Sequence, residues 1–283
     1  MLPPLAVLPQ YLFPKQALTA FAGWVAGHER GWVTTEIIRR FVLKYSVNMD
    51  EALDSNIGSY ASFNDFFTRA LKPGARPLAK ADLICPVDGA ISQFGPISGD
   101  QIFQAKGHRY STTALVGGDA ALAAQFENGS FATLYLSPKD YHRIHMPCDG
   151  RLMQMVYVPG DLFSVNPTTA CGVPGLFARN ERVVCVFESV RGLFVLVLVG
   201  ATIVGSMATV WHGVVNPPRL PNVKTWHYDK QVEFKQGDEM GRFLLGSTVV
   251  MLFPKTPLAF NPDWASGRVI RLGEAMANYQ ELS

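Results

Sequence analysis

The sequence predicts a mainly β protein with a barrel-like or sandwich-like core, added helices and a separate helical segment at the N-terminus. From about residue 83, apolar runs of strand length alternate with Gly, Pro, Asn and Asp, which is typical of an all-β barrel or sandwich. The uncharged stretch 192–211 fits this pattern, because Gly200, Gly205 and Ser206 divide it into Val-rich pieces of strand length. The predicted strands are 84–87, 90–94, 131–136, 152–158, 183–187, 193–199, 201–204, 207–211, 231–234 and the interrupted run 242–253.

Residues 1–46 differ in composition from the rest of the chain. The uncharged stretch 17–27 is too short to span a bilayer, which needs about 20 apolar residues. Trp24 and Trp32 are residue types found at membrane interfaces, and apolar positions at helical spacing in 35–42 stand beside basic residues. We therefore expect 1–46 to form helices that lie on a membrane by one face, with 47–283 as the β-rich domain. A helical appendage packed on that domain is the alternative.

The composition narrows the classes of partner. Lys and Arg total 25 against 23 Asp and Glu, for a net charge of +2, so we expect no nucleic acid partner. Charged residues make up 17% and hydrophobic residues 48% of the chain, which favours contact with a bilayer surface. The four cysteines form no CxxC pair and the first residues lack a signal-peptide pattern. We expect reduced thiols and a protein that faces the cytoplasm.

One glycine interrupts the last long apolar run. Leu245, Gly246, Ser247 and Thr248 separate two pieces that otherwise read as one strand. A glycine in such a run marks a β-bulge or a close approach to the backbone, and a plain bulge is the simplest interpretation. Because the Ser247 hydroxyl directly follows the Gly246 carbonyl, we also hypothesise that this serine breaks its own peptide bond and that the new chain end becomes the catalytic group.

Three other side chains are suited to activating that serine. Asp88 lies in an Asp-Gly pair that predicts a turn, but a carboxylate there is also suited to orient a histidine. His142 and His145 lie between Ser137, a predicted helix cap, and Pro147, which ends the predicted helix. Their spacing then places both imidazoles on one helix face, where they suit acid–base chemistry near neutral pH. Two ordinary surface histidines are the alternative, and we predict no metal site because no other cluster with ligand spacing completes one.

The order Asp88, His145, Ser247 is one of the chain orders known for catalytic triads. The Gly-x-Ser-x-Gly turn of a hydrolase is missing around Ser247. A serine hydrolase must keep its nucleophile intact, whereas self-processing uses it once. From these residues alone, a serine hydrolase, a self-processing enzyme and a non-catalytic, peripheral lipid-binding domain all remain open.

Several short segments in one register extend this pattern over about residues 63–253. They are FFTR at 66–69, LKPGARP at 71–77, PVDG at 86–89, YHRIHMP at 141–147, FARNERV at 177–183, GATIVGS at 200–206, GRF at 241–243 and LGST at 245–248. In these segments the chain resembles the bacterial phosphatidylserine decarboxylase proenzymes. Leu-Gly-Ser-Thr alone is a weak signal, but it is specific in register with the Asp-Gly and His-x-x-His segments.

The resemblance implies a self-processing carboxy-lyase whose catalytic domain is 47–283. His145, oriented by Asp88, would remove the proton of Ser247, whose oxygen attacks the Gly246 carbonyl. The resulting ester would eliminate to dehydroalanine, which hydrolyses to a pyruvoyl group and ammonia. Cleavage between Gly246 and Ser247 would give a large subunit, 1–246, and a small subunit, 247–283.

The pyruvoyl group formed from Ser247 is the cofactor that the resemblance implies. It would form a Schiff base with phosphatidylserine and accept the electron pair as carbon dioxide leaves. A proton from His142 or His145 would complete phosphatidylethanolamine, which places the protein in phospholipid biosynthesis. The expected location is the cytoplasmic side of the cell membrane, as a peripheral protein, and a homo-oligomer is left open.

Overall fold

A computed structural model describes residues 7, 10, 15–29, 31–202, 206–216, 219–228, 232–244 and 248–280. Its helical elements are α2 (Lys15–Gly27), α3 (Trp32–Tyr45), η1 (Ile57–Ser59), α4 (Phe63–Phe67), α5 (Thr112–Leu115), α6 (Ala120–Ala124), α7 (Pro167–Gly172) and α8 (Leu176–Arg179). Its strands are β1 (Leu83–Ile84), β2 (Gly89–Pro96), β3 (Gln101–Ala105), β4 (His108–Ser111), β5 (Ser130–Tyr135), β6 (Arg143–His145), β7 (Gly150–Val158), β8 (Arg182–Ser189), β9 (Gly192–Val199), β10 (Met207–Thr209), β11 (Gly213–Val214), β12 (Lys224–His227), β13 (Glu233–Phe234), β14 (Glu239–Phe243), β15 (Thr248–Phe253), β16 (Leu258–Phe260), β17 (Val269–Ile270) and β18 (Ala275–Tyr279).

The main sheet contains nine of these strands. Its order is β12-β7-β8-β9-β15-β5-β2-β17, and β13 also pairs with β7. The short strands β12 and β17 are the two ends, and within the part of the chain that the structure describes they do not pair with each other. The sheet is therefore open. The prediction of a mainly β protein is confirmed. Of the two cores that we predicted, a barrel or a sandwich, the closed barrel is wrong.

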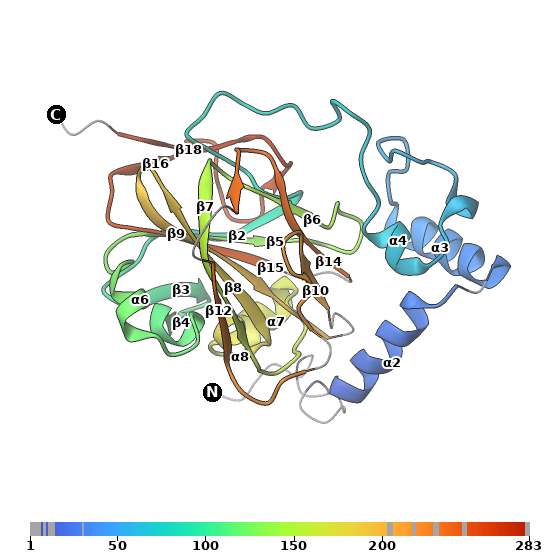
Figure 1. The fold of residues 1–283 in the computed structure, drawn as a ribbon, viewed down its shortest axis with the longest axis horizontal. Helices are drawn as coiled ribbons and strands as arrows, with labels where there is room; N and C mark the ends of the chain where they lie inside the picture. The colour runs from blue at the N-terminus through green and yellow to red at the C-terminus, as the bar shows by residue number, and fades with distance from the viewer. Residues whose placement is uncertain are drawn as a thin grey trace.

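Both faces of the main sheet are buried. Cys185 on β8 and Met251 on β15 belong to one hydrophobic cluster, while their neighbours Val184 and Val250 belong to another. The small sheets β1-β18-β16 and β11-β10-β14-β6 contribute to the first cluster, and the β3–β4 hairpin with α5–α8 contributes to the second (Figure 1). This burial on both sides explains why the central strands are almost continuously apolar in sequence.

The uncharged stretch 192–211 forms strands, as the glycine pattern predicts. β9 lies within the main sheet between β8 and β15, whereas β10 lies in a different sheet between β11 and β14. The stretch therefore links two layers of the fold. The predicted strand at 201–204 is not found: Ala201 and Thr202 form a bridge and a turn, and Ile203 and Val204 lie outside the described residues.

The N-terminal helices pack on one another beside the β body. Ala26 of α2 and Ile38 of α3 share a small cluster with Phe63, Phe66 and Phe67 of α4. In Figure 1, α2, α3 and α4 lie together at one side of the molecule, next to the side that carries β6, β10 and β14. No helix within the described residues is both long and apolar enough to cross a bilayer.

Candidate active site

The candidate site lies where four strands of the main sheet end together. Ala90 of β2 pairs with Tyr135 of β5, Tyr135 pairs with Thr248 of β15, and Thr248 pairs with Val199 of β9. Neighbouring strands lie about 4.8 Å apart, so the segments just beyond these residues meet at one edge. Within the described residues these segments are Asp88, the loop 136–142 and residues 200–202, and Thr248 itself is the first described residue after 245–247.

The junction itself, Leu245 to Ser247, lies outside the described residues, and so do the two predicted cleavage residues, Gly246 and Ser247. Its borders are defined. The amide of Phe243 donates to the carbonyl of His142 at 3.0 Å, and the amide of Leu244 donates to the carbonyl of Ser206 at 3.0 Å. On the other border, Thr248 is fully buried and its hydroxyl oxygen has no hydrogen-bond partner within the described residues.

His142 is a neutral imidazole with a free ring nitrogen. Its side chain is fully buried, and Nδ1 lies 2.7 Å from the carbonyl oxygen of Asp140. Because a carbonyl oxygen only accepts hydrogen bonds, Nδ1 carries the proton and Nε2 keeps its lone pair. Nε2 has no partner within the described residues. Burial lowers the pKa of His142 from 6.5 to about 3, so the ring is neutral at physiological pH.

His145 has the same tautomer but a different partner at its second nitrogen. Nδ1 donates to the carbonyl of Gly237 at 2.8 Å, and Nε2 accepts from the hydroxyl of Tyr141 at 3.2 Å. Burial lowers the pKa of His145, although the Gly237 carbonyl acts in the opposite direction. His145 is therefore also a base at neutral pH. His145 is the last residue of β6, three residues after His142, and it pairs with Glu239 of β14.

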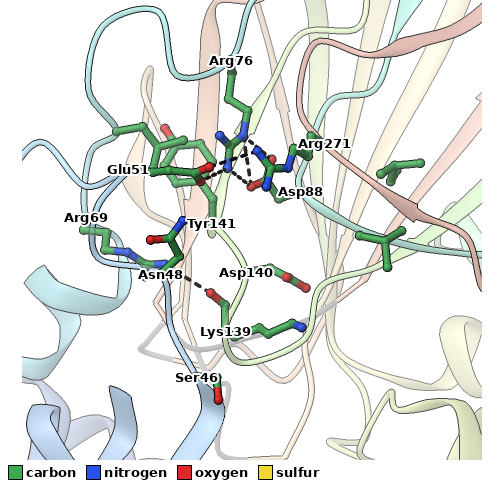
Figure 2. Close-up of a pocket in the computed structure, with 13 residues that line it drawn as sticks. Ser46, Asn48, Glu51, Arg69, Arg76, Asp88, Lys139, Asp140, Tyr141 and Arg271 are labelled. Carbon is green, nitrogen blue, oxygen red and sulfur yellow. Dashed lines mark hydrogen bonds and ion pairs between the residues drawn. The ribbon is translucent and has the colours of Figure 1, made fainter. Parts of the chain in front are cut away.

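Asp88 is held by an arginine. Its carboxylate accepts from Arg76 Nε at 2.9 Å and from Arg76 Nη2 at 2.6 Å, and the amide of Leu272 donates to it at 2.8 Å. Glu51 binds the same guanidinium at 2.7 Å (Figure 2). These bonds raise the pKa of Arg76 despite its burial, which acts in the opposite direction. Asp88 does not hydrogen-bond His145 in this structure, so the predicted orienting bond is replaced by those from Gly237 and Tyr141.

The helix predicted from Ser137 to Pro147 is wrong. The Asp140 carboxylate accepts from the Ser137 amide and hydroxyl, both at 2.7 Å, and closes a turn. The chain then extends as β6 and pairs with β14. His142 and His145 therefore do not share a helix face: one precedes the strand and is fully buried, and the other ends the strand and is partly buried.

Sequence reasoning assigned no role to Arg76, Arg69, Tyr141 or Asp140. Arg76, Arg69 and Tyr141 lie within the segments that carry the family resemblance, and that resemblance could have indicated that they matter for the site. Their contacts with Asp88 and with the two histidines depend on the fold. No group of three metal-ligating side chains occurs among the residues that the structure describes.

The predicted single, interrupted strand is two strands in different sheets, β14 before the junction and β15 after it. Two neutral imidazoles and a buried carboxylate define a site for acid–base catalysis. The comparisons with known proteins identify its family. A family model described as phosphatidylserine decarboxylase matches residues 63–278, and one described as PSD matches residues 5–46. The chain belongs to the phosphatidylserine decarboxylase family.

Its similarity to individual relatives covers almost the whole chain. It is 81% identical over 278 residues to the phosphatidylserine decarboxylase proenzyme of Variovorax paradoxus, covering 98% of each chain. It is 80% identical to the protein of the same name in Polaromonas sp. strain JS666, covering 97% of this chain and 98% of the relative. The protein of that name in Dechloromonas aromatica is 72% identical, with 97% and 98% coverage.

Proposed function

We propose that the chain is a phosphatidylserine decarboxylase proenzyme, which cleaves itself between Gly246 and Ser247 and then converts phosphatidylserine to phosphatidylethanolamine and carbon dioxide. The observation that carries this proposal is the full-length relationship to proteins named as such proenzymes. The described geometry supports it, because His142, a neutral imidazole, accepts a backbone hydrogen bond from Phe243 at the border of the junction.

In the self-cleavage step, His145 is the base and Ser247 the nucleophile. The Nε2 lone pair of His145 accepts the Ser247 proton as the oxygen attacks the Gly246 carbonyl, after exchanging its present bond with Tyr141. Asp88 acts through its charge, which raises the pKa of His145 against the larger lowering by burial. A carboxylate fixed by Arg76 in this way favours the imidazolium without touching it.

The residues around the junction fit a small polar group at position 247. The Thr248 hydroxyl and His142 Nε2 are buried without partners in the described part of the chain, and both belong to residues that border the junction. A pyruvoyl group there supplies an electron sink for the bond that loses carbon dioxide. His142 and His145 each offer a ring nitrogen that can take up a proton and return it to the product carbon.

The helices α2 and α3 hold the enzyme on the cytoplasmic surface of the membrane in this proposal, as a peripheral protein. Trp24 is 53% exposed, Trp32 79% and Leu43 73%. Arg39 and Arg40 are also exposed on α3. Exposed aromatic and aliphatic side chains together with cations suit an anionic bilayer surface.

The intact mass of the purified protein tests the processing. We expect two chains, 1–246 and 247–283, and a blocked N-terminus on the smaller one. Ser247→Ala is expected to leave one uncut chain that releases no carbon dioxide from phosphatidylserine. The matched control is Ser189→Ala, at the turn between β8 and β9, where the hydroxyl bonds only locally; it should be cut normally. An active enzyme of one full-length chain, labelled by a serine-directed phosphonate, would favour the hydrolase instead.

Sedimentation with phosphatidylglycerol vesicles tests the membrane contact. The double variant Trp32→Ala, Leu43→Ala should bind several-fold more weakly than the wild type because it loses exposed apolar area. Val190→Ala shortens a side chain that is 99% exposed, in the β8–β9 turn, and should bind as the wild type does. Equal binding of all three proteins would exclude α3 as the membrane contact.

A further inference from the structure

A cavity of about 200 Å³ lies beside the candidate active site. Its lining includes Ser46 and Asn48, which come after α3 in the chain, and Asp88 and Tyr141, which belong to the site. Figure 2 shows this cavity with Arg69 and Lys139 at the same wall. The cavity therefore extends from the end of the N-terminal helices to the residues that surround the histidines.

Most charges around the cavity are paired with each other. Arg76 binds Asp88 and Glu51, and Arg271 binds Glu51 at 3.0 Å. The carboxylate of Asp140 is occupied by the Ser137 amide and hydroxyl. These groups satisfy one another without a ligand.

Arg69 differs from these groups, because it is a buried charge without a charged partner among the described residues. It is only 4% exposed, and its guanidinium donates to the Lys139 carbonyl at 3.2 Å. Within the described residues its Nε is buried without a hydrogen-bond partner and no carboxylate lies at ion-pair distance; its other contact is the Phe66 ring, whose centroid is 5.4 Å from the guanidinium carbon. Burial lowers the pKa of Arg69, and the negative charges of Asp88 and Asp140 act on it only through space.

A buried guanidinium with five donors and one neutral acceptor is costly unless an anion binds it. Arginine presents its donors as a planar fork that matches phosphate or carboxylate oxygens. If the N-terminal helices contact the membrane, as proposed, a lipid headgroup reaches the catalytic residues through the cavity that Arg69 lines.

We propose that Arg69 binds the phosphodiester of the lipid headgroup in this cavity, an inference that rests on the proposed function. The phosphodiester is favoured over the serine carboxylate for a chemical reason. A carboxylate bound by an arginine is stabilised in the ground state, which opposes its loss as carbon dioxide. A phosphodiester keeps its charge throughout the reaction, so binding it positions the serine without this penalty.

Headgroup binding to the uncut chain tests the assignment. Phosphorus NMR is used to measure the affinity of glycerophosphoserine, which carries the headgroup without acyl chains, for the Ser247→Ala protein. Because the Ser247→Ala chain is expected to stay uncut, a second substitution that impairs self-cleavage does not change the measured affinity. Adding Arg69→Gln should weaken binding about 10- to 100-fold, and Arg69→Lys should cause a smaller loss because it keeps the charge but not the fork. Arg151→Gln, from an exposed ion pair with Glu188, should not change the affinity.

Each other outcome has a definite meaning. Unchanged affinity in Arg69→Gln would overturn the inference; if that variant is unfolded by circular dichroism, Arg69→Lys decides in the same way. Inorganic phosphate that binds as tightly as glycerophosphoserine would assign the cavity to free phosphate and overturn the headgroup assignment. A wild-type protein that releases no carbon dioxide from phosphatidylserine would overturn the proposed function instead, so the two failures are distinguishable.

Discussion

At the scale of single residues, the chemistry of the site depends on which ring nitrogen carries the proton. In both His142 and His145 a backbone carbonyl fixes the proton on Nδ1, and burial opposes the charged form. Each ring therefore presents Nε2 as a base. The difference between them is that Tyr141 occupies Nε2 of His145, whereas Nε2 of His142 is free of partners within the described chain.

Tyr141→Phe is expected to raise the pKa of His145. The Tyr141 hydroxyl, whose own pKa burial raises to about 12, donates only to the neutral imidazole and so stabilises the neutral form. Without that bond His145 is protonated at a higher pH, and self-cleavage should lose rate at pH 6 relative to pH 8. The pKa is measured by NMR in the uncut Ser247→Ala chain, and the rate by a time course of freshly translated protein.

Tyr110→Phe provides the control for this change. Tyr110 is a buried tyrosine of the second hydrophobic cluster, and its hydroxyl has no partner in the described part of the chain. Its replacement should leave the pKa of His145 unchanged. A pKa that falls or stays constant in Tyr141→Phe would mean that the hydroxyl does not donate to Nε2.

The sequence predicted a site made of Asp88, His142, His145 and Ser247, and the structure brings Asp88 and His142 to one sheet edge without testing the whole set. Asp88 and His142 reach the same sheet edge because strand register places them there, as the family pattern implied. The partner of Asp88 could not be deduced, because Arg76 reaches it from a segment without regular structure. That His145 takes the Ser247 proton stays a prediction.

At the scale of elements, local signals were overridden where a side chain satisfied the backbone in another way. Ser137 and Pro138 are typical of a helix start, but Asp140 closes a turn on Ser137, and pairing with β14 holds residues 143–145 as a strand. In contrast, the start of α4 agrees with its local signal. Ser62 and Asp65 cap it reciprocally, which is the geometry that their spacing favours.

Gly89→Ala is expected to disturb the edge of the sheet at the site. A Cβ at Gly89 would lie 2.4 Å from the carbonyl oxygen of Tyr135, so β2 and β5 must separate next to Asp88. We expect a loss of about 1–3 kcal/mol in the free energy of unfolding and slower self-cleavage. Urea unfolding of the Ser247→Ala chain and intact mass during translation measure the two effects.

Gly23→Ala is the matched substitution in open space. No atom lies within 4 Å of a Cβ at Gly23 in helix α2, so the change should leave cleavage unaffected and stabilise the helix slightly. If Gly89→Ala were equally harmless, the close approach of β2 and β5 would not be needed for the site.

At the scale of the whole molecule, the order of strands explains how the chain would stay together after the proposed cut. β15 comes after the junction in sequence, yet it lies between β9 and β5 in the main sheet. The proposed small subunit would thus supply a central, fully buried strand. The apolar runs predicted the strands themselves, but not this order or the open edges, because pairing between distant strands depends on packing of both sheet faces.

A charged network also joins the two proposed subunits. Glu51, Arg76 and Asp88 precede the junction, whereas Arg271 and Leu272 come after it. Arg76 is at the centre of the network and its side chain is only 8% exposed. Removing it leaves two carboxylates near each other without their shared cation.

Arg76→Gln is therefore expected to lower the free energy of unfolding by about 3–5 kcal/mol at pH 7. The hydrogen bond from Arg76 lowers the pKa of Glu51 below 4.5, so the stability that Glu51 contributes is present above pH 4.5 and is lost as the pH falls. The difference in free energy of unfolding between wild type and variant should therefore shrink at pH 4.

Urea unfolding of the uncut Ser247→Ala chain at both pH values measures this difference. The control is Arg151→Gln, from an exposed ion pair, which should change the free energy of unfolding by less than about 1 kcal/mol. An equal loss at pH 7 and pH 4 would show that Arg76 stabilises the protein by packing, and that the carboxylates do not depend on its charge.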